Sequence, residues 1–110
     1  MKITIREEGD TSEVVLDGKM DTNTTPIAEA EITTLLDGGA SQLLINFEQL
    51  SYISSSGLRL LLATAKRLKG SGGGLKVCSL NEMATEVFEI SGFSSILNVY
   101  PSEQEALGGS

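Results

Sequence analysis

Short alternating runs of apolar and polar residues predict strands in the first half of the chain. Residues 2–7 place Ile3 and Ile5 on one side and polar side chains on the other, as in a half-buried strand. After a short turn, residues 13–16 predict a second strand, antiparallel to the first because the connection is tight. The nearly continuous apolar run 42–47 is typical of a central strand that is parallel to the second one, because a helix separates them.

Apolar positions at helical spacing predict two long helices around this central strand. Thr25 and Pro26 predict the start of the first, with threonine as cap and proline at the first helical position, and Gly38 ends it. The second helix follows a run of serines, and its buried face is formed by Leu58, Leu61, Leu62, Ala65 and Leu68. Leu60 is expected on the opposite, outer face of this helix because of the 3.6-residue period.

The remaining segments continue the alternation of strands and helices. Residues 19–25 are expected to form a polar loop, and residues 75–79 predict a further strand. Asn81 predicts the cap of a third helix, and Ser102 that of a terminal helical turn. An apolar segment at 93–99 completes the pattern as a short strand or helix. The order indicates one α/β domain without linkers or repeats.

Composition and charge exclude several classes of function. The 110 residues suffice for one domain, and the 40% hydrophobic and 5% aromatic content predicts an aliphatic core. A net charge of −7 disfavours direct nucleic-acid binding, and Lys66, Arg67 and Lys69 are interpreted as a solvated helix face. The sequence has no apolar stretch near the ~18 residues of a membrane span and no signal peptide, so we expect no membrane insertion and a cytoplasmic location.

The single cysteine and the absence of histidine limit the possible chemistry. Cys78 lies in an apolar run and is interpreted as a buried structural residue in a reducing compartment. Without histidine, a zinc site or a Ser-His-Asp triad is disfavoured, and the Gly-x-Ser-x-Gly elbow of serine hydrolases is also missing. The glycines at 70–74 lack the Gly-Lys-Ser/Thr ending of a phosphate loop. We therefore expect no catalytic residues, no metal and no cofactor.

The serine cluster 54–56, followed by Gly57, connects an extended apolar run to the second helix. The first turn of a helix has free amides and partial positive charge, so a phosphate on a serine there is electrostatically favoured. Gly57 removes a side chain and allows close approach of a partner's backbone or of ATP. Helix capping is the alternative, because serine is a favoured N-cap by about 1 kcal/mol over alanine. Residue chemistry alone favours capping.

Two further positions are candidates with equally ordinary alternatives. Asp21 and Thr22 lie in a loop between a strand and a helix, where functional loops of α/β domains are often found. The alternative is a polar loop without function. Leu60, as an apolar residue expected on an outer helix face near the serines, is either a docking contact or incidental.

Five collinear motifs carry a resemblance to a known family. They are Leu-Asp-Gly-Lys-Met-Asp at 16–21, the strand and approach at 43–53, Ser-Ser-Gly-Leu at 55–58, Gly-Gly-Gly-Leu at 72–75 and Phe-Glu-Ile-Ser-Gly-Phe at 88–93. In this order they resemble a STAS domain, specifically the anti-sigma factor antagonists (anti-anti-sigma factors) of bacterial partner switching. The resemblance covers nearly the whole chain.

The resemblance implies a STAS domain over residues 1–107, with a disordered tail at 108–110. Its fold would be a mixed sheet of four or five strands with helices mainly on one face. It implies a non-enzymatic phosphoprotein of signal transduction and transcription regulation, which binds an anti-sigma factor serine kinase that carries the ATP and magnesium. The resemblance also implies a phosphatase that resets the protein. The phosphorylated residue would be Ser55, with Ser56 as the neighbouring candidate. The implied partner-binding residues are Asp21, Thr22, Ser54, Ser56, Gly57, Leu58, Arg59 and Leu60.

Two positions depart from the family signature. Ser54 stands where the signature has an aspartate, and Arg59 stands where it has a glycine. The missing acid changes the surroundings of Ser55, and the Arg59 guanidinium can pair with a phosphate and reduce its repulsive effect. The alternative function is therefore a STAS interaction module of a transport or sensory complex that is not phosphorylated.

Overall fold

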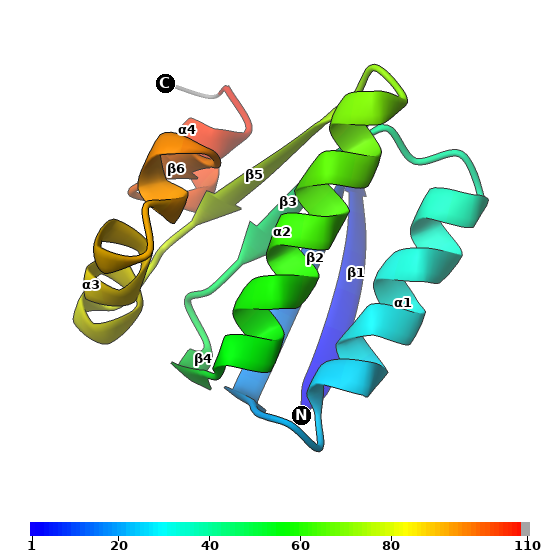
Figure 1. Cartoon of the computed structure of the whole chain (residues 1–110). Coiled ribbons are helices and arrows are strands. Elements are labelled where there is room, and N and C mark those ends of the chain that lie inside the picture. Colours follow the sequence, from blue (N-terminus) through cyan, green and yellow to red (C-terminus); the bar gives the residue numbers. More distant parts are fainter. Residues whose placement is uncertain (109–110) are drawn as a thin grey trace.

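A six-stranded mixed β-sheet forms the middle layer of the protein (Figure 1). The computed structural model describes residues 1–108. The strands are β1 (Lys2–Glu8), β2 (Thr11–Met20), β3 (Gln42–Asn46), β4 (Leu50–Ile53), β5 (Gly74–Cys78) and β6 (Asn98–Tyr100). Their order is β1-β2-β3-β5-β6, and β4 pairs with the second half of β2. The β1–β2 pair is antiparallel, whereas β3 is parallel to both β2 and β5.

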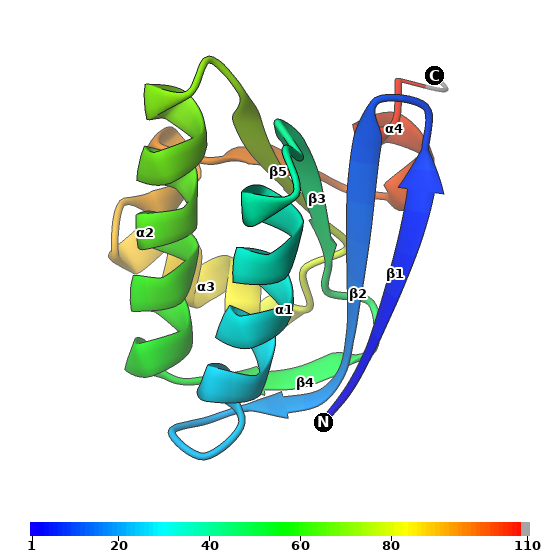
Figure 2. The same cartoon turned by 90° about the vertical axis from the view of Figure 1, so that its right-hand side faces the viewer.

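The helices lie mainly on one face of this sheet. They are α1 (Thr25–Asp37), α2 (Ser55–Gly70), α3 (Glu82–Ile90), the 3-10 helix η1 (Phe93–Ser95) and α4 (Glu103–Ala106). Figure 2 shows α1 and α2 side by side on one face, with α4 on the opposite side of the sheet. The α/β class and the mixed sheet covered mainly on one face are confirmed. The sheet has six strands rather than four or five.

The strand β2 extends further along the chain than the sequence pattern predicted. Residues 19–20 were expected in a polar loop, but they pair with Tyr52 and Ile53 of β4 after a register shift at Gly18. Gly18 has a φ of +117°, which favours glycine at this irregularity. Met20 is fully buried as a result. The expected extended approach to the serines is therefore a strand, and it anchors the start of α2 to the sheet.

The main core lies between the sheet and the helices α1, α2 and α3. Its fully buried members include Val14, Leu16, Ile45, Leu61, Leu68 and Val77, so the predicted aliphatic core is confirmed. Phe88 of α3 packs edge-to-face on Phe47, with ring centroids 5.8 Å apart. A smaller cluster on the opposite face consists of Leu44, Cys78 and Ala106. Cys78 is fully buried there, as predicted.

The predicted placement of Leu60 on the outer face of α2 is wrong. Leu60 is only 8% exposed and belongs to the main core. The reason is that α2 packs against both the sheet and α1, and Leu60 lines the boundary with α1 together with Ile32 and Leu36. A second neighbour widens the buried face of a helix beyond the stripe that one neighbour requires. Leu60 is therefore not a free docking contact in this fold.

Helix caps agree with the sequence at three of four starts. Asn81 and Ser102 accept hydrogen bonds from Ala84 N (2.8 Å) and Glu105 N (3.2 Å), respectively, and Ser54 caps α2. At α1 the cap is Thr24 rather than Thr25, one residue earlier than predicted. Gly108 follows α4 in a turn, and residues 109–110 of the expected disordered tail lie outside the described residues. Within residues 1–108, no helix has the length and apolarity required to cross a membrane.

Candidate functional site

The loop after β2 and the start of α2 lie at the same edge of the sheet (Figure 2). β2 and β4 are parallel, and Met20 at the end of β2 is in register with Ile53 at the end of β4. Ser54 N donates a hydrogen bond to Met20 O at 2.8 Å, which ties the two strand ends together. The sheet therefore brings the predicted loop at Asp21 and Thr22 next to the serine cluster.

Ser54 is the N-cap of α2. Its backbone is extended, and its Oγ accepts a hydrogen bond from Gly57 N at 3.3 Å. Aspartate and serine are both favoured N-caps, so Ser54 can fill the structural role of the signature aspartate without its charge. For this serine the capping interpretation is confirmed.

Ser55 is the exposed first residue of α2. Among residues 1–108, no hydrogen-bond partner contacts its hydroxyl, and the amides of Ser55 and Ser56 are also unpaired, as expected in a first helical turn. An anionic group attached here lies close to two free donors and to the positive end of the helix dipole. The position can thus accommodate a phosphate without disturbing the core.

Ser56 and Arg59 form a pair on the same helix. The Nη2 atom of Arg59 donates to Ser56 Oγ at 3.3 Å, and Arg59 is exposed whereas Ser56 is half-buried. This contact draws the guanidinium back over the first turn of α2. The cation expected from the sequence is therefore paired with Ser56, the residue that follows Ser55.

Gly57 faces the interior of the protein. The structural reason for a glycine at this position therefore differs from the predicted one, which was the close approach of a partner. A Cβ at this position would lie 2.6 Å from Met20 Sδ and 2.7 Å from Ile53 Cγ1. The close approach is to the protein's own core, and Gly57 is buried. Leu58 is half-buried against the same core. Gly57 therefore sets how closely α2 approaches β2 and β4.

Asp21 organises the loop that faces α2. Its Oδ1 accepts hydrogen bonds from Asn23 N (2.9 Å) and Thr24 N (3.0 Å). The hydrogen bond from the Thr24 backbone is the main cause that lowers the pKa of Asp21, so its carboxylate is charged at neutral pH. Thr22 is exposed at the tip of this loop. Asp21 thus has a structural role, and its contact with a partner stays a prediction.

Two exposed apolar residues near this edge were missed in the sequence. Ile27 in the first turn of α1 is 49% exposed, and Tyr52 in β4 is 44% exposed. The buried face of α1 is formed by Thr25, Ala28 and Ile32. The spacing between these three residues was the available signal, because Ile27 falls outside their stripe. Large exposed apolar side chains beside a polar site are typical of interaction surfaces.

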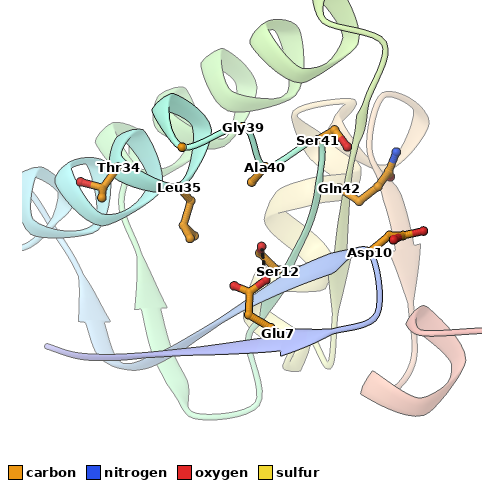
Figure 3. A pocket seen from close by; sticks show the side chains of 10 residues that line it. Glu7, Asp10, Ser12, Thr34, Leu35, Gly39, Ala40, Ser41 and Gln42 are labelled. Carbon is orange, nitrogen blue, oxygen red and sulfur yellow. Dashed lines mark hydrogen bonds between the residues drawn. The ribbon is translucent and has the colours of Figure 1, made fainter.

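An open hollow of about 560 Å³ lies elsewhere, between the β1–β2 turn and the end of α1 (Figure 3). Glu7, Asp10 and Gln42 line it together with Ser12, which donates to Glu7 Oε1 at 3.0 Å. The two acidic side chains disfavour the phosphates of a nucleotide. Cys78 is also a poor nucleophile, because burial raises the pKa of its thiol to about 11. The hollow is therefore unsuited to a nucleotide, and Cys78 is unsuited to nucleophilic attack.

Sequence comparison decides the family. Residues 2–106 match the STAS domain. This chain belongs to the STAS domain family. One relative is the BtrV protein of Bordetella bronchiseptica, which is provisionally named an anti-sigma factor antagonist. It is 37% identical to this chain over 106 residues, and the alignment covers 96% of this chain and 91% of BtrV. The STAS domain thus falls among the anti-sigma factor antagonists, a family of regulators rather than enzymes.

Solved structures of anti-sigma factor antagonists share this fold. An anti-sigma factor antagonist from Mycobacterium paratuberculosis has a TM-score of 0.91 at 23% identity, over 98% of this chain and 92% of that one. The phosphorylated form of SpoIIAA from Bacillus has a TM-score of 0.78 at 25% identity, over 98% of both chains. SpoIIAA is itself named an anti-sigma factor antagonist. The second structure demonstrates that a protein with a similar fold exists in a phosphorylated form.

Proposed function

We propose that this protein is an anti-sigma factor antagonist that binds a serine-kinase anti-sigma factor and is released when that kinase phosphorylates Ser55. The observation that carries the proposal is the exposed, unpaired hydroxyl of Ser55 at the start of α2. The family membership and the phosphorylated relative SpoIIAA support it. The protein would act in the cytoplasm without a cofactor of its own, because the kinase supplies ATP and magnesium.

The charge change explains how phosphorylation would release the partner. A phosphate adds about −1.5 to −2 charge at neutral pH. The start of α2 tolerates this charge in the free protein, because two amides and the helix dipole favour an anion there. In a packed complex the same charge is desolvated and costly unless the partner supplies a cation. Phosphorylation would then weaken the complex without unfolding the antagonist, and a phosphatase would restore binding.

The partner surface would extend from α2 to the neighbouring loop. Thr22 and Arg59 are exposed beside Ser55, and Ile27 and Tyr52 add apolar area at the same edge. Leu60 is buried, so we do not include it in the proposed contact surface. Gly57 and Leu58 would act indirectly, by fixing the position of the helix start.

A second function is favoured by the contact between Arg59 and Ser56. The guanidinium already occupies the first turn of α2, so it can neutralise part of a phosphate charge and weaken a switch. The chain would then be a STAS interaction module of a transport or sensory complex that is not regulated by phosphorylation.

Incubation with the cognate kinase and ATP, followed by mass spectrometry, separates these functions. We expect one phosphate on the wild type, none on Ser55→Ala and one on Ser56→Ala. A stable kinase complex without any phosphate would leave antagonist binding intact but reject phosphorylation. The absence of both binding and phosphate would favour the second function.

A further inference from the structure

A buried carboxyl group lies on the face of the sheet opposite to α1 and α2. Glu13 in β2 is fully buried, and its Oε1 has no hydrogen-bond partner among the described residues. Its Oε2 accepts from Asn46 Nδ2 at 2.9 Å. A buried, half-satisfied carboxylate is costly unless a proton or a cation compensates it. Something beyond this one hydrogen bond must therefore stabilise Glu13.

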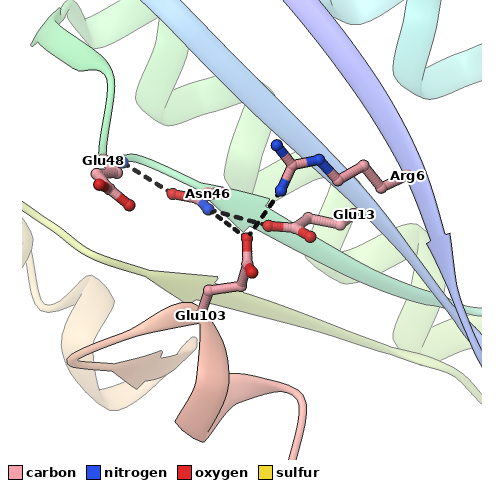
Figure 4. A network of polar contacts seen from close by, with 5 residues as sticks. All are labelled: Arg6, Glu13, Asn46, Glu48 and Glu103. Carbon is pink, nitrogen blue, oxygen red and sulfur yellow. Dashed lines mark hydrogen bonds and ion pairs between the residues drawn. The ribbon is translucent and has the colours of Figure 1, made fainter.

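Glu103 of the C-terminal helix α4 meets the same amide group (Figure 4). Asn46 Nδ2 also donates to Glu103 Oε2 at 3.0 Å, so one amide bridges two carboxyl groups from segments 90 residues apart. Because both carboxyl groups accept from this one amide nitrogen, Glu13 and Glu103 lie side by side. Two carboxyl groups can share a hydrogen bond only while one of them is protonated.

Other charged and titratable groups face this cluster from each neighbouring element. Arg6 of β1 is paired in register with Glu13 across the sheet, but its Nη1 contacts Glu103 Oε2 at 3.3 Å. That ion pair is partly exposed, with side-chain exposures of 52% and 36%. Cys78 of β5 is neutral, and Glu48 after β3 adds a further acid. Arg6, which is partly exposed and contacts Glu103, therefore does not fully compensate a second negative charge at Glu13.

We propose that Glu13 and Glu103 form a proton-dependent latch, which holds α4 on the sheet while the pair shares one proton and releases α4 when both carboxyl groups are ionised. Burial, followed by the hydrogen bond with Glu103, raises the pKa of Glu13 to about 7, so the proton is lost near neutral pH. The proton leaves to solvent, and repulsion between the two carboxylates then acts on Glu103.

The helix that would be released, α4, is four residues long. Its buried contact is Ala106, which packs on Leu44 and Cys78. Lys76 Nζ donates to Ala106 O at 3.0 Å, and this contact does not depend on the Glu13 proton. Release of α4 therefore exposes Leu44 and the thiol of Cys78, the single cysteine of the chain.

The Cys78 thiol provides a direct readout of the latch in the full-length protein. Its reaction with a disulfide reagent such as 5,5′-dithiobis(2-nitrobenzoate) would be timed at pH 6 and pH 8.5 for the wild type and for Glu13→Gln. A higher pH also increases the thiolate fraction of Cys78 in the open state and so accelerates its reaction. This increase is the same in both proteins, so it cancels in the ratio of their reaction rates. The neutral amide of glutamine imitates the protonated acid. We expect the ratio of wild-type rate to variant rate to increase about tenfold between these pH values.

A ratio that is constant with pH would overturn the latch. If Glu13→Gln does not fold, Glu103→Gln serves instead, because removal of the second carboxyl group also abolishes the repulsion. Glu105→Gln on the same helix is the control and should behave as the wild type. Amide exchange at pH 8.5 must be faster in residues 103–108 than in β3, since equal exchange would indicate global unfolding and would also overturn the proposal.

Discussion

Gly57 faces the side chain of Met20 so closely, at the point where α2 begins, that no space for a Cβ remains between them. The contact joins the signature segment of the helix to the end of β2, so the two segments fix each other's position. Replacement of Gly57 by alanine places a methyl group 2.6 Å from Met20 Sδ. We expect a loss of about 1–2 kcal/mol in the free energy of unfolding, because overpacking outweighs the better helix propensity of alanine. Urea denaturation of the wild type and of Gly57→Ala measures this difference in the free energy of unfolding.

Gly70, the last residue of the same helix, is the matched control for this prediction. A Cβ at Gly70 has no atom within 4 Å. Gly70→Ala should therefore leave stability unchanged or increase it by up to about 1 kcal/mol. Equal losses for Gly57→Ala and Gly70→Ala would contradict the close-packing explanation.

The neighbouring serines should separate capping from signalling. Ser54→Ala removes the acceptor of the Gly57 amide and should cost about 1 kcal/mol of stability. Ser55→Ala removes an exposed hydroxyl without a partner and should change stability by less than about 0.5 kcal/mol. Thermal or urea unfolding of the two variants side by side is sufficient. A larger loss for Ser55→Ala than for Ser54→Ala would show that the cap is assigned to the wrong serine.

A negative charge at Ser55 should weaken binding to the kinase while the fold stays intact. We expect Ser55→Asp to increase the dissociation constant at least about tenfold, since an uncompensated buried charge costs more than 1.4 kcal/mol. Calorimetric titration with the cognate kinase measures the affinity, and circular dichroism checks the fold. Ser55→Asn is the neutral control of the same shape. If asparagine weakens binding as much as aspartate, sterics rather than charge explain the effect.

Arg59 should moderate that effect. An exposed ion pair contributes about 0.2–1 kcal/mol, so the guanidinium would offset only part of a charge at position 55. The penalty of Ser55→Asp on kinase binding should therefore become about two- to fivefold larger in the background of Arg59→Ala. Lys66→Ala, an exposed cation two turns further along α2, is the control and should not change the penalty. If Ser55→Asp weakens kinase binding equally in the wild type, in Arg59→Ala and in Lys66→Ala, Arg59 does not moderate the effect of the charge.

The raised pKa of Glu13 predicts a pH dependence of global stability. Folding favours the neutral acid, so this stability is fully present below about pH 4.5 and is lost as the pH rises through about 7. Between pH 5 and pH 8 the wild type should lose roughly 2–3 kcal/mol relative to Glu13→Gln. Urea unfolding of both proteins at the two pH values tests the difference. A stability difference independent of pH would indicate an ordinary pKa for Glu13 in the folded protein.

Local patterns were sufficient for most elements of this fold. The alternation around Ile3 and Ile5, the apolar run into Phe47 and the caps Asn81 and Ser102 all predicted elements that the structure contains. These signals depend on neighbours in the sequence, and they therefore persist whatever packs against them. The position of the serine cluster at a helix start was predictable for the same reason.

The errors concern residues whose environment is set by distant segments. Leu60 is buried because α1 packs beside α2, and Met20 is buried because β4 extends the sheet. Glu13 looks like an outward-facing acid in its strand until α4, ninety residues later, covers that face. The sequence pattern could not specify these contacts, because a strand or helix alone does not indicate how many neighbours it has.

The presentation of Ser55 restricts which enzymes can modify it. Its hydroxyl stands at the blunt end of a 16-residue helix that is held by Met20 and Ile53, rather than in an extended stretch of chain. A kinase whose groove reads a linear peptide would find no such peptide on the folded protein. Recognition must instead involve the shape of the folded edge, and a short synthetic fragment around Ser55 should be a poor substitute for the whole domain.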